Sequence, residues 1–252
     1  MRKLLFIVVL IAVVFALTSA FADTFQVTAE KPGVQVPPLG LSYENFNGQT
    51  AGTVLGGGTF TTTYGGSQYQ GDYTGSLLWF SANAYGGAGG SGVFPEVLSG
   101  NSYNIAISAL GGAPAANYFG LWFSALDIGS QLQFYNNSTL LFSFTPASFI
   151  ALVGPCNGSN PYCGNPNNGA DSGEQFAYLN FWDSNGSFNK IVVSELSNCP
   201  PCGFESDNHT VRYLTNGPGG LPIPTTPEPS SVLMLGTGLL GMTGVLRRKL
   251  NR

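Results

Sequence analysis

Short runs of alternating apolar and polar residues constrain the fold of this chain more than any other feature. Clusters of Gly, Asn, Pro and Ser separate these runs, and the chain holds 35 glycines in 252 residues. Alternation predicts β-strands, because successive side chains of a strand point to opposite faces. The predicted strands cover residues 59–64, 76–85, 103–110, 118–125, 131–135, 139–144, 175–183, 188–196 and 209–214.

The number and spacing of these strands predict the fold class. Outside the two ends, no long amphipathic helix is expected, and residues 146–152 alone predict one short turn of helix. Residues 23–43 are Pro-rich and predict an entry strand or arm. Many short strands in one domain indicate an all-β, antiparallel β-sandwich, and we expect a jelly-roll-like topology.

The N-terminus has the pattern of a secretory signal peptide. A charged start is followed by an apolar core at residues 4–17 and by an A-x-A cleavage site that contains Ala20 and Ala22. Residues 1–22 are therefore predicted to direct the chain to the secretion translocon.

The C-terminus has the pattern of a marginal membrane span. As a helix, apolar residues 230–246 would rise roughly 26 Å, slightly less than a bilayer core of about 30 Å. The basic residues Arg247, Arg248 and Lys249 follow it, and cationic side chains are retained in the cytoplasm. We therefore expect an exported domain at residues 23–216, a Gly/Pro linker at 217–226 and a membrane-associated segment at 227–252.

The C-terminal segment resembles a known sorting signal. The triplet Pro227, Glu228 and Pro229, the Gly-rich apolar helix and the basic tail are similar to the PEP-CTERM signal of Gram-negative bacteria. The resemblance implies processing by an exosortase, a membrane-embedded cysteine protease, and residence at the cell surface or in the extracellular matrix. It also implies a structural or adhesive role beside extracellular polysaccharide in a biofilm.

A looser resemblance covers the second half of the exported part. Several segments are similar to exosortase-dependent surface proteins of the kind found in cyanobacteria, among them residues 118–122, 132–135, 164–167, 176–181 and 204–211. This resemblance implies a secreted β-domain and no particular reaction.

Charge excludes one class of partner. The chain has 9 Lys and Arg against 13 Asp and Glu, and most of the basic residues lie in the two terminal segments. Because an acidic surface repels phosphate backbones, we expect no nucleic acid partner.

Four cysteines lie in the exported part, and we expect them to form disulfides because export leads to an oxidising compartment. They are Cys156, Cys163, Cys199 and Cys202, and they permit three connectivities. Two alternatives stay open, a zinc site and a redox centre, since Cys199 and Cys202 have C-x-x-C spacing.

The predicted strand 175–183 suggests a glycan-binding surface as an alternative function. Alternation places Tyr178, Asn180 and Trp182 on one face, where the two rings would stack on sugars. The competing interpretation is that these aromatic side chains are buried, because aromatic residues are common in strands and bury large areas.

Two acidic, Asn-rich loops at residues 165–171 and 203–209 suggest a calcium site. If strands 175–183 and 188–196 form a hairpin across Asn185 and Gly186, both loops lie at one end of the sheet. Carboxylate and amide oxygens are suitable ligands for calcium. The candidate ligands are Asp171, Glu174, Glu205, Asp207 and Asn208, and the competing interpretation is that these residues form turns.

No sequence pattern indicates catalysis. The single histidine, His209, has no G-x-S-x-G serine motif to work with. Glu205 and Asp207 alternate on one segment, whereas a glycosidase needs two carboxyl groups across the bond. We therefore expect no enzyme activity, and no cofactor other than calcium.

Overall fold

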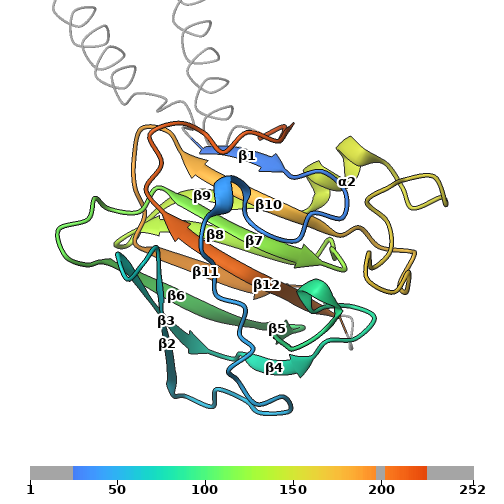
Figure 1. Ribbon diagram of the computed structural model, residues 1–252, viewed down its shortest axis with the longest axis horizontal. Helices are drawn as coiled ribbons and strands as arrows, with labels where there is room; N and C mark the ends of the chain where they lie inside the picture. Colours follow the sequence, from blue (N-terminus) through green and yellow to red (C-terminus); the bar gives the residue numbers. More distant parts are fainter. Residues whose placement is uncertain (1–24, 197–201, 226–252) are drawn as a thin grey trace, which may run out of the picture. The chain divides into compact units, whose positions relative to one another are not determined.

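Two antiparallel sheets pack face to face in the computed structural model, which describes residues 25–196 and 202–225 (Figure 1). The larger sheet has the order β13 (Leu221–Ile223), β1 (Phe25–Ala29), β10 (Ala177–Asp183), β7 (Tyr118–Ser124), β12 (Gly203–Arg212), β5 (Val93–Leu98) and β4 (Leu78–Ser81). The smaller has the order β2 (Thr59–Tyr64), β3 (Tyr69–Gly75), β6 (Asn101–Ala109), β11 (Lys190–Glu195), β8 (Ser130–Asn136) and β9 (Thr139–Phe144). The predicted all-β sandwich is confirmed.

Within residues 25–196 and 202–225, helical structure is confined to short elements. The α-helix α2 (Ala147–Val153) coincides with the predicted short helix and has Pro146 as its N-cap. Two 3₁₀ turns, η1 (Pro38–Gly40) and η2 (Ala88–Gly90), lie in connections. No helix in the described parts of the chain is long and apolar enough to cross a membrane. The predicted signal peptide and the membrane helix 230–246 lie outside the described residues.

Two sequence predictions about pairing are wrong. Strands β10 and β11 do not form a hairpin, because β10 pairs with β1 and β7 while β11 pairs with β6 and β8 in the other sheet. The turn after Asp183 carries the chain across the sandwich instead. Residues 203–208, predicted as a loop, form the first part of β12, so the two predicted loops do not meet in the expected way.

The exported domain extends beyond the predicted boundary at residue 216. Strand β13 lies in the segment that was predicted to be a linker, and it pairs with β1, with Ile223 opposite Val27. Ile223 is buried in the core. The compact unit accordingly runs over Thr24–Thr225.

The main core fills the space between the sheets. Strand β7 contributes Phe119, Leu121 and Phe123 to it, as the alternation predicts. Facing strands of the smaller sheet contribute aromatic side chains such as Phe134, whose ring centroid lies 6.2 Å from that of Phe119. These inward-facing residues hold the two sheets together by burying apolar surface.

The outer face of the larger sheet is buried as well. A second cluster there contains Trp122, Ala125, Phe176 and Tyr178, with Ala88 packed against it. Ala125, predicted to belong to the main core, lies in this outer cluster. Loops cover the cluster, and Asn165 Nδ2 donates to the carbonyl oxygens of Asn83 and Ala84 to tie two of them together. Strand β7 is therefore buried on both faces.

A disulfide lies in the segment between α2 and β10. Cys156 and Cys163 form it, with Cα atoms 5.6 Å apart. Cys202 is disulfide-bonded too, while Cys199 lies outside the described residues. For the three described cysteines the disulfide prediction is confirmed, in place of zinc or redox chemistry.

Candidate functional site

The candidate site begins at an irregularity in β12. The register between β12 and β7 shifts between Asp207 and Thr210, which marks a β-bulge. Asn208 has a φ of 50°, a left-handed conformation that Asn tolerates better than most residues. Bulges place an extra residue on one strand and re-aim its side chains. Here Asp207 and Asn208 both line a pocket on the outer face of the sheet.

The other edge of β12 changes its partner at the same place. Strand β5 pairs with Gly203, Phe204 and Glu205. Farther along, the segment at Glu44 pairs with His209 through two backbone hydrogen bonds of 2.8 and 3.0 Å. Within the described residues, no strand bridges the gap between these two pairings. Asp207 and Asn208 therefore lie at a break in the sheet.

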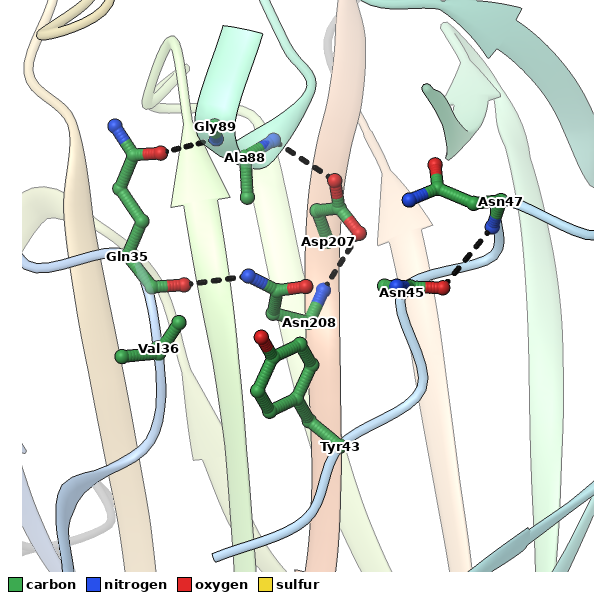
Figure 2. A pocket seen from close by; sticks show the side chains of 9 residues that line it. All are labelled: Gln35, Val36, Tyr43, Asn45, Asn47, Ala88, Gly89, Asp207 and Asn208. Atoms are coloured by element: carbon green, nitrogen blue, oxygen red, sulfur yellow. Dashed lines mark hydrogen bonds between the residues drawn. The ribbon is translucent and has the colours of Figure 1, made fainter. Parts of the chain in front are cut away.

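A pocket of about 220 Å³ occupies this break. Figure 2 shows Asp207 and Asn208 on β12, with one wall formed around Gln35 and another around Asn45 and Asn47. The complete lining consists of Gln35, Val36, Tyr43, Asn45, Asn47, Ala88, Gly89, Asp207 and Asn208. The walls therefore come from three segments that are far apart in the sequence.

Hydrogen bonds hold these segments in place. The backbone N–H of Ala88 donates to Asp207 Oδ2 at 2.8 Å. Asn208 Nδ2 donates to the Gln35 carbonyl oxygen at 2.7 Å, and the Gly89 N–H donates to the Gln35 side chain. On the other side, Asn47 Oδ1 accepts from the Val93 N–H at 2.9 Å. These hydrogen bonds fix the walls of the pocket without the help of a ligand.

Several polar groups at the pocket retain hydrogen-bonding capacity. Among the described residues, the Tyr43 hydroxyl, the amide nitrogens of Asn45 and Asn47, and Asn208 Oδ1 have no hydrogen-bond partner. These groups comprise two amide donors, one carbonyl acceptor and one hydroxyl that can do either. Tyr43 is 41% exposed, so its ring is available to a ligand.

Asp207 supplies the carboxyl group of the pocket, and its surroundings have opposing effects on its pKa. The pKa of Asp207 is raised to about 7, because the effect of burial, with a smaller one from Glu44, outweighs the lowering by the N–H groups of Ala88 and Asn208. Only 2% of Asp207 is exposed, and both carboxylate oxygens accept from backbone N–H groups. Its main role is therefore to position η2 and the bulge.

The predicted glycan-binding face is wrong, because its side chains are largely covered. Tyr178 is buried, and its hydroxyl donates to the Asn208 carbonyl oxygen at 3.1 Å. Asn180 is also buried and accepts from the Tyr118 hydroxyl at 2.7 Å. Trp182 is half-buried and donates to the Leu214 carbonyl oxygen. Tyr178 and Asn180 are therefore not accessible to a sugar, and the predicted three-residue face does not form.

The five predicted calcium ligands do not come together as one set. Asp207 and Asn208 line the pocket, whereas Asp171 and Glu174 lie in the loop before β10. Glu205 lies beside Glu96 of β5. In the described part of the chain, no group of three or more His, Cys, Asp or Glu side chains is arranged to hold a metal ion. The grouping failed because the predicted hairpin does not form.

His209 faces the core rather than the pocket. Its Nδ1 lies 2.9 Å from the Tyr73 hydroxyl and its Nε2 lies 3.0 Å from Ser206 Oγ. Burial lowers the pKa of His209 to about 3, which keeps the ring neutral. Both ring nitrogens of His209 are therefore engaged in hydrogen bonds within the core.

Sequence reasoning missed most of the pocket, since Gln35, Tyr43, Asn45 and Asn47 lie in segments without strand periodicity. One signal was present: Asp207 and Asn208 are residue types depleted in strands, yet apolar and β-branched residues follow them. Such a pair within a strand indicates a bulge, and bulges are common beside functional sites.

Comparison with known proteins identifies the C-terminal segment. The family model of the PEP-CTERM protein-sorting motif matches residues 225–249, which include Pro227, Glu228, Pro229 and the basic Arg247, Arg248 and Lys249. No curated protein and no solved structure matches the chain. The motif marks an exosortase-processed protein that is exported to the cell surface or beyond it.

Proposed function

This chain carries a PEP-CTERM sorting motif and is exported. From that premise, we propose that its domain Thr24–Thr225 has an adhesive role in the extracellular matrix. The domain binds neutral sugar units of an extracellular polysaccharide in the pocket at the β12 bulge. The observation that carries this proposal is the combination, in one pocket, of unpaired amide, carbonyl and hydroxyl groups with an exposed tyrosine ring.

The chemistry of the lining supports a sugar ligand. A sugar presents hydroxyl groups that both donate and accept, and the Asn45, Asn47 and Asn208 amides offer matching groups. The Tyr43 ring adds an apolar surface with a polar hydroxyl group. This combination suits a sugar, which has an apolar C–H face and polar hydroxyl groups. A few polar groups fixed by the surrounding fold are typical of small-molecule sites.

Charge favours a neutral ligand. The residues between the terminal segments contain three Lys and Arg against twelve Asp and Glu, a formal net charge of −9. Among the described residues that line the pocket, Asp207 alone has an ionisable carboxyl group. Anionic sugars would therefore be repelled, and one carboxyl group does not supply the pair that glycoside cleavage uses.

A binding comparison of matched tyrosine variants tests the proposal. The full-length protein in detergent is screened on a glycan array, and the affinity for the best oligosaccharide is then measured by calorimetry. Tyr43→Ala should weaken binding by about 10-fold, which corresponds to about 1.4 kcal/mol. The control is Tyr85→Ala, because Tyr85 is 51% exposed and lies outside the pocket lining.

Both variants should keep the melting temperature of the parent protein, since each removes an exposed ring. The proposal fails when no glycan on the array binds, or when Tyr43→Ala binds as tightly as Tyr85→Ala.

A further inference from the structure

A second polar cluster lies on the outer face of the same sheet, in a row across three strands. Glu96 of β5 is directly opposite Glu205 of β12, and Glu205 is directly opposite Ser124 of β7. Neighbouring strands are about 4.8 Å apart, so adjacent members of this row are close enough to share one ligand. We refer to Glu96, Glu205 and Ser124 as the acidic row.

The acidic row is buried, and it is incompletely paired. Glu96 and Glu205 are each 7% exposed and Ser124 is 0% exposed. Among the described atoms, Glu205 Oε2 and Ser124 Oγ have no hydrogen-bond partner. Buried polar atoms are nearly always paired, so two unpaired atoms on adjacent strands require an explanation.

The side chain of Glu96 packs against the backbone of β12. A Cβ atom added to Gly203 would collide with Glu96 Oε1, so the carboxyl group of Glu96 lies directly over Gly203. The carboxyl group of Glu96 is therefore turned toward β12, the strand that carries Glu205.

Further acidic side chains surround the row. Burial raises the pKa of Glu205 well above its usual range, and the charges of Glu96, Asp127 and Glu174 raise it further. Glu174 in turn is raised to a pKa of about 8 by burial and by Asp171. Carboxyl groups from two strands and two loops thus lie close enough to raise one another's pKa.

The basic side chains of the described residues do not neutralise the acidic row, because they make other contacts or are exposed to solvent. Lys190 lies over the Tyr135 ring at 4.3 Å, Arg212 donates to Gln68 at 3.0 Å, and Lys31 is exposed. None of them is among the groups that influence the Glu205 carboxyl group. Compensation for the acidic row must therefore come from protons or from a cation.

We propose that the acidic row binds a calcium ion between the carboxylates of Glu96 and Glu205, with the Ser124 hydroxyl as a neutral ligand. Calcium takes six to eight oxygen ligands in flexible geometry, and water completes shells that the protein leaves open. Two glutamates are compatible with the finding that no three acidic, His or Cys side chains in the described residues form a closed site. Asp127 and Glu174 add long-range attraction without direct ligation.

This site is separate from the glycan pocket. The pocket lining contains Asp207 and Asn208 but none of the acidic row. Calcium binding therefore does not depend on the proposed function, and either can fail alone.

A thermal melt with and without calcium tests the proposal. The full-length protein in detergent is freed of metal with a chelator and melted at pH 8, where protons compete least. Calcium at about a hundredfold excess over its Kd should raise the melting temperature by about 5 to 10 °C for a domain of this size. Glu205→Gln should abolish the shift, while Asp72→Asn, on β3 of the other sheet, should keep it.

Glu205→Gln is expected to fold, because glutamine has the same shape and carries no charge to bury. Magnesium serves as the second probe and should give a smaller shift, since it demands near-ideal octahedral geometry.

Two results would overturn the proposal. The first is an unchanged melting temperature of the parent protein at about 10 mM calcium, tenfold above the ~10⁻³ M Kd of weak extracellular sites. The acidic row would then be neutralised by protons alone. The second is a calcium shift that persists in Glu205→Gln, which would place the ion elsewhere.

Discussion

Both faces of β12 carry buried polar residues, but the two faces differ in how fully the polar atoms are hydrogen-bonded. On the inner face, Ser206 and His209 are fully buried, and both are hydrogen-bonded. On the outer face, Glu205 and Asn208 are buried to nearly the same degree, and each keeps an unpaired oxygen. The inner set is therefore suited to stabilise the fold and the outer set to bind ligands.

The inner set forms a continuous chain between the sheets. The Tyr64 and Tyr73 hydroxyls bond to each other, Tyr73 bonds to His209, and His209 bonds to Ser206. Aromatic rings enclose it, with the Phe46 centroid 4.9 Å from that of His209. A polar chain of this kind belongs to the core because its members satisfy one another.

The largest expected effect comes from breaking the inner chain. His209→Ala removes a buried ring and leaves the Tyr73 hydroxyl and Ser206 Oγ without this partner. We expect a loss of about 3 to 5 kcal/mol in the free energy of unfolding, since a cavity and unpaired polar groups add together. Urea unfolding of the full-length protein in detergent measures it.

The matched outer-face change is Asn208→Gly, which keeps the left-handed backbone and removes the hydrogen bond to Gln35. It should cost only about 1 kcal/mol. Equal losses for the two variants would contradict the division between a stabilising and a binding face.

The two faces of β12 also differ in how their ionisable groups change the stability of the protein with pH, and this effect is smaller. The pKa of His209 is about 3 in the folded protein, against an ordinary value of 6.5. Below 6.5 the unfolded chain binds a proton that the folded chain does not, so stability falls on acidification. The difference in stability between the parent and His209→Gln, which cannot titrate, should shrink by about 2 kcal/mol from pH 8 to pH 5.

The acids of the outer face act in the opposite direction. Burial raises the pKa of Glu96 to about 7 and that of Asp207 to about 7. Above their ordinary values the folded chain holds protons that the unfolded chain has lost, so these groups add stability on acidification. Comparing the parent with His209→Gln at each pH cancels this contribution. A difference that does not change with pH would show that His209 is not held neutral.

The sequence predicted the strands where alternation is clear, and it missed those that depend on the rest of the fold. Residues 59–64 and 139–144 match β2 and β9 without adjustment. Strand β13 is three residues long and contains Pro222, which only an edge strand accommodates. Residues 203–208 look like a loop because they are polar, yet their partners on β5 and β7 make them a strand.

The two functional predictions failed for a related reason. Asn185 and Gly186 indicate a turn correctly, but a turn signal does not say whether the next strand pairs with the previous one or joins the other sheet. Similarly, alternation at Tyr178 and Asn180 separates two faces without showing that loops cover the outer one. Both errors concern long-range packing, which no local pattern contains.

The most direct test of the division between the faces is a map of the ligand on the protein. In an NMR titration with the best oligosaccharide from the array, the side-chain amide signals of Asn45, Asn47 and Asn208 should shift. The amide signal of Asn180, which is buried and bonded to Thr28 and Glu30, should stay unchanged. Shifts confined to residues away from the β12 bulge, or no shifts at a saturating concentration, would contradict the account.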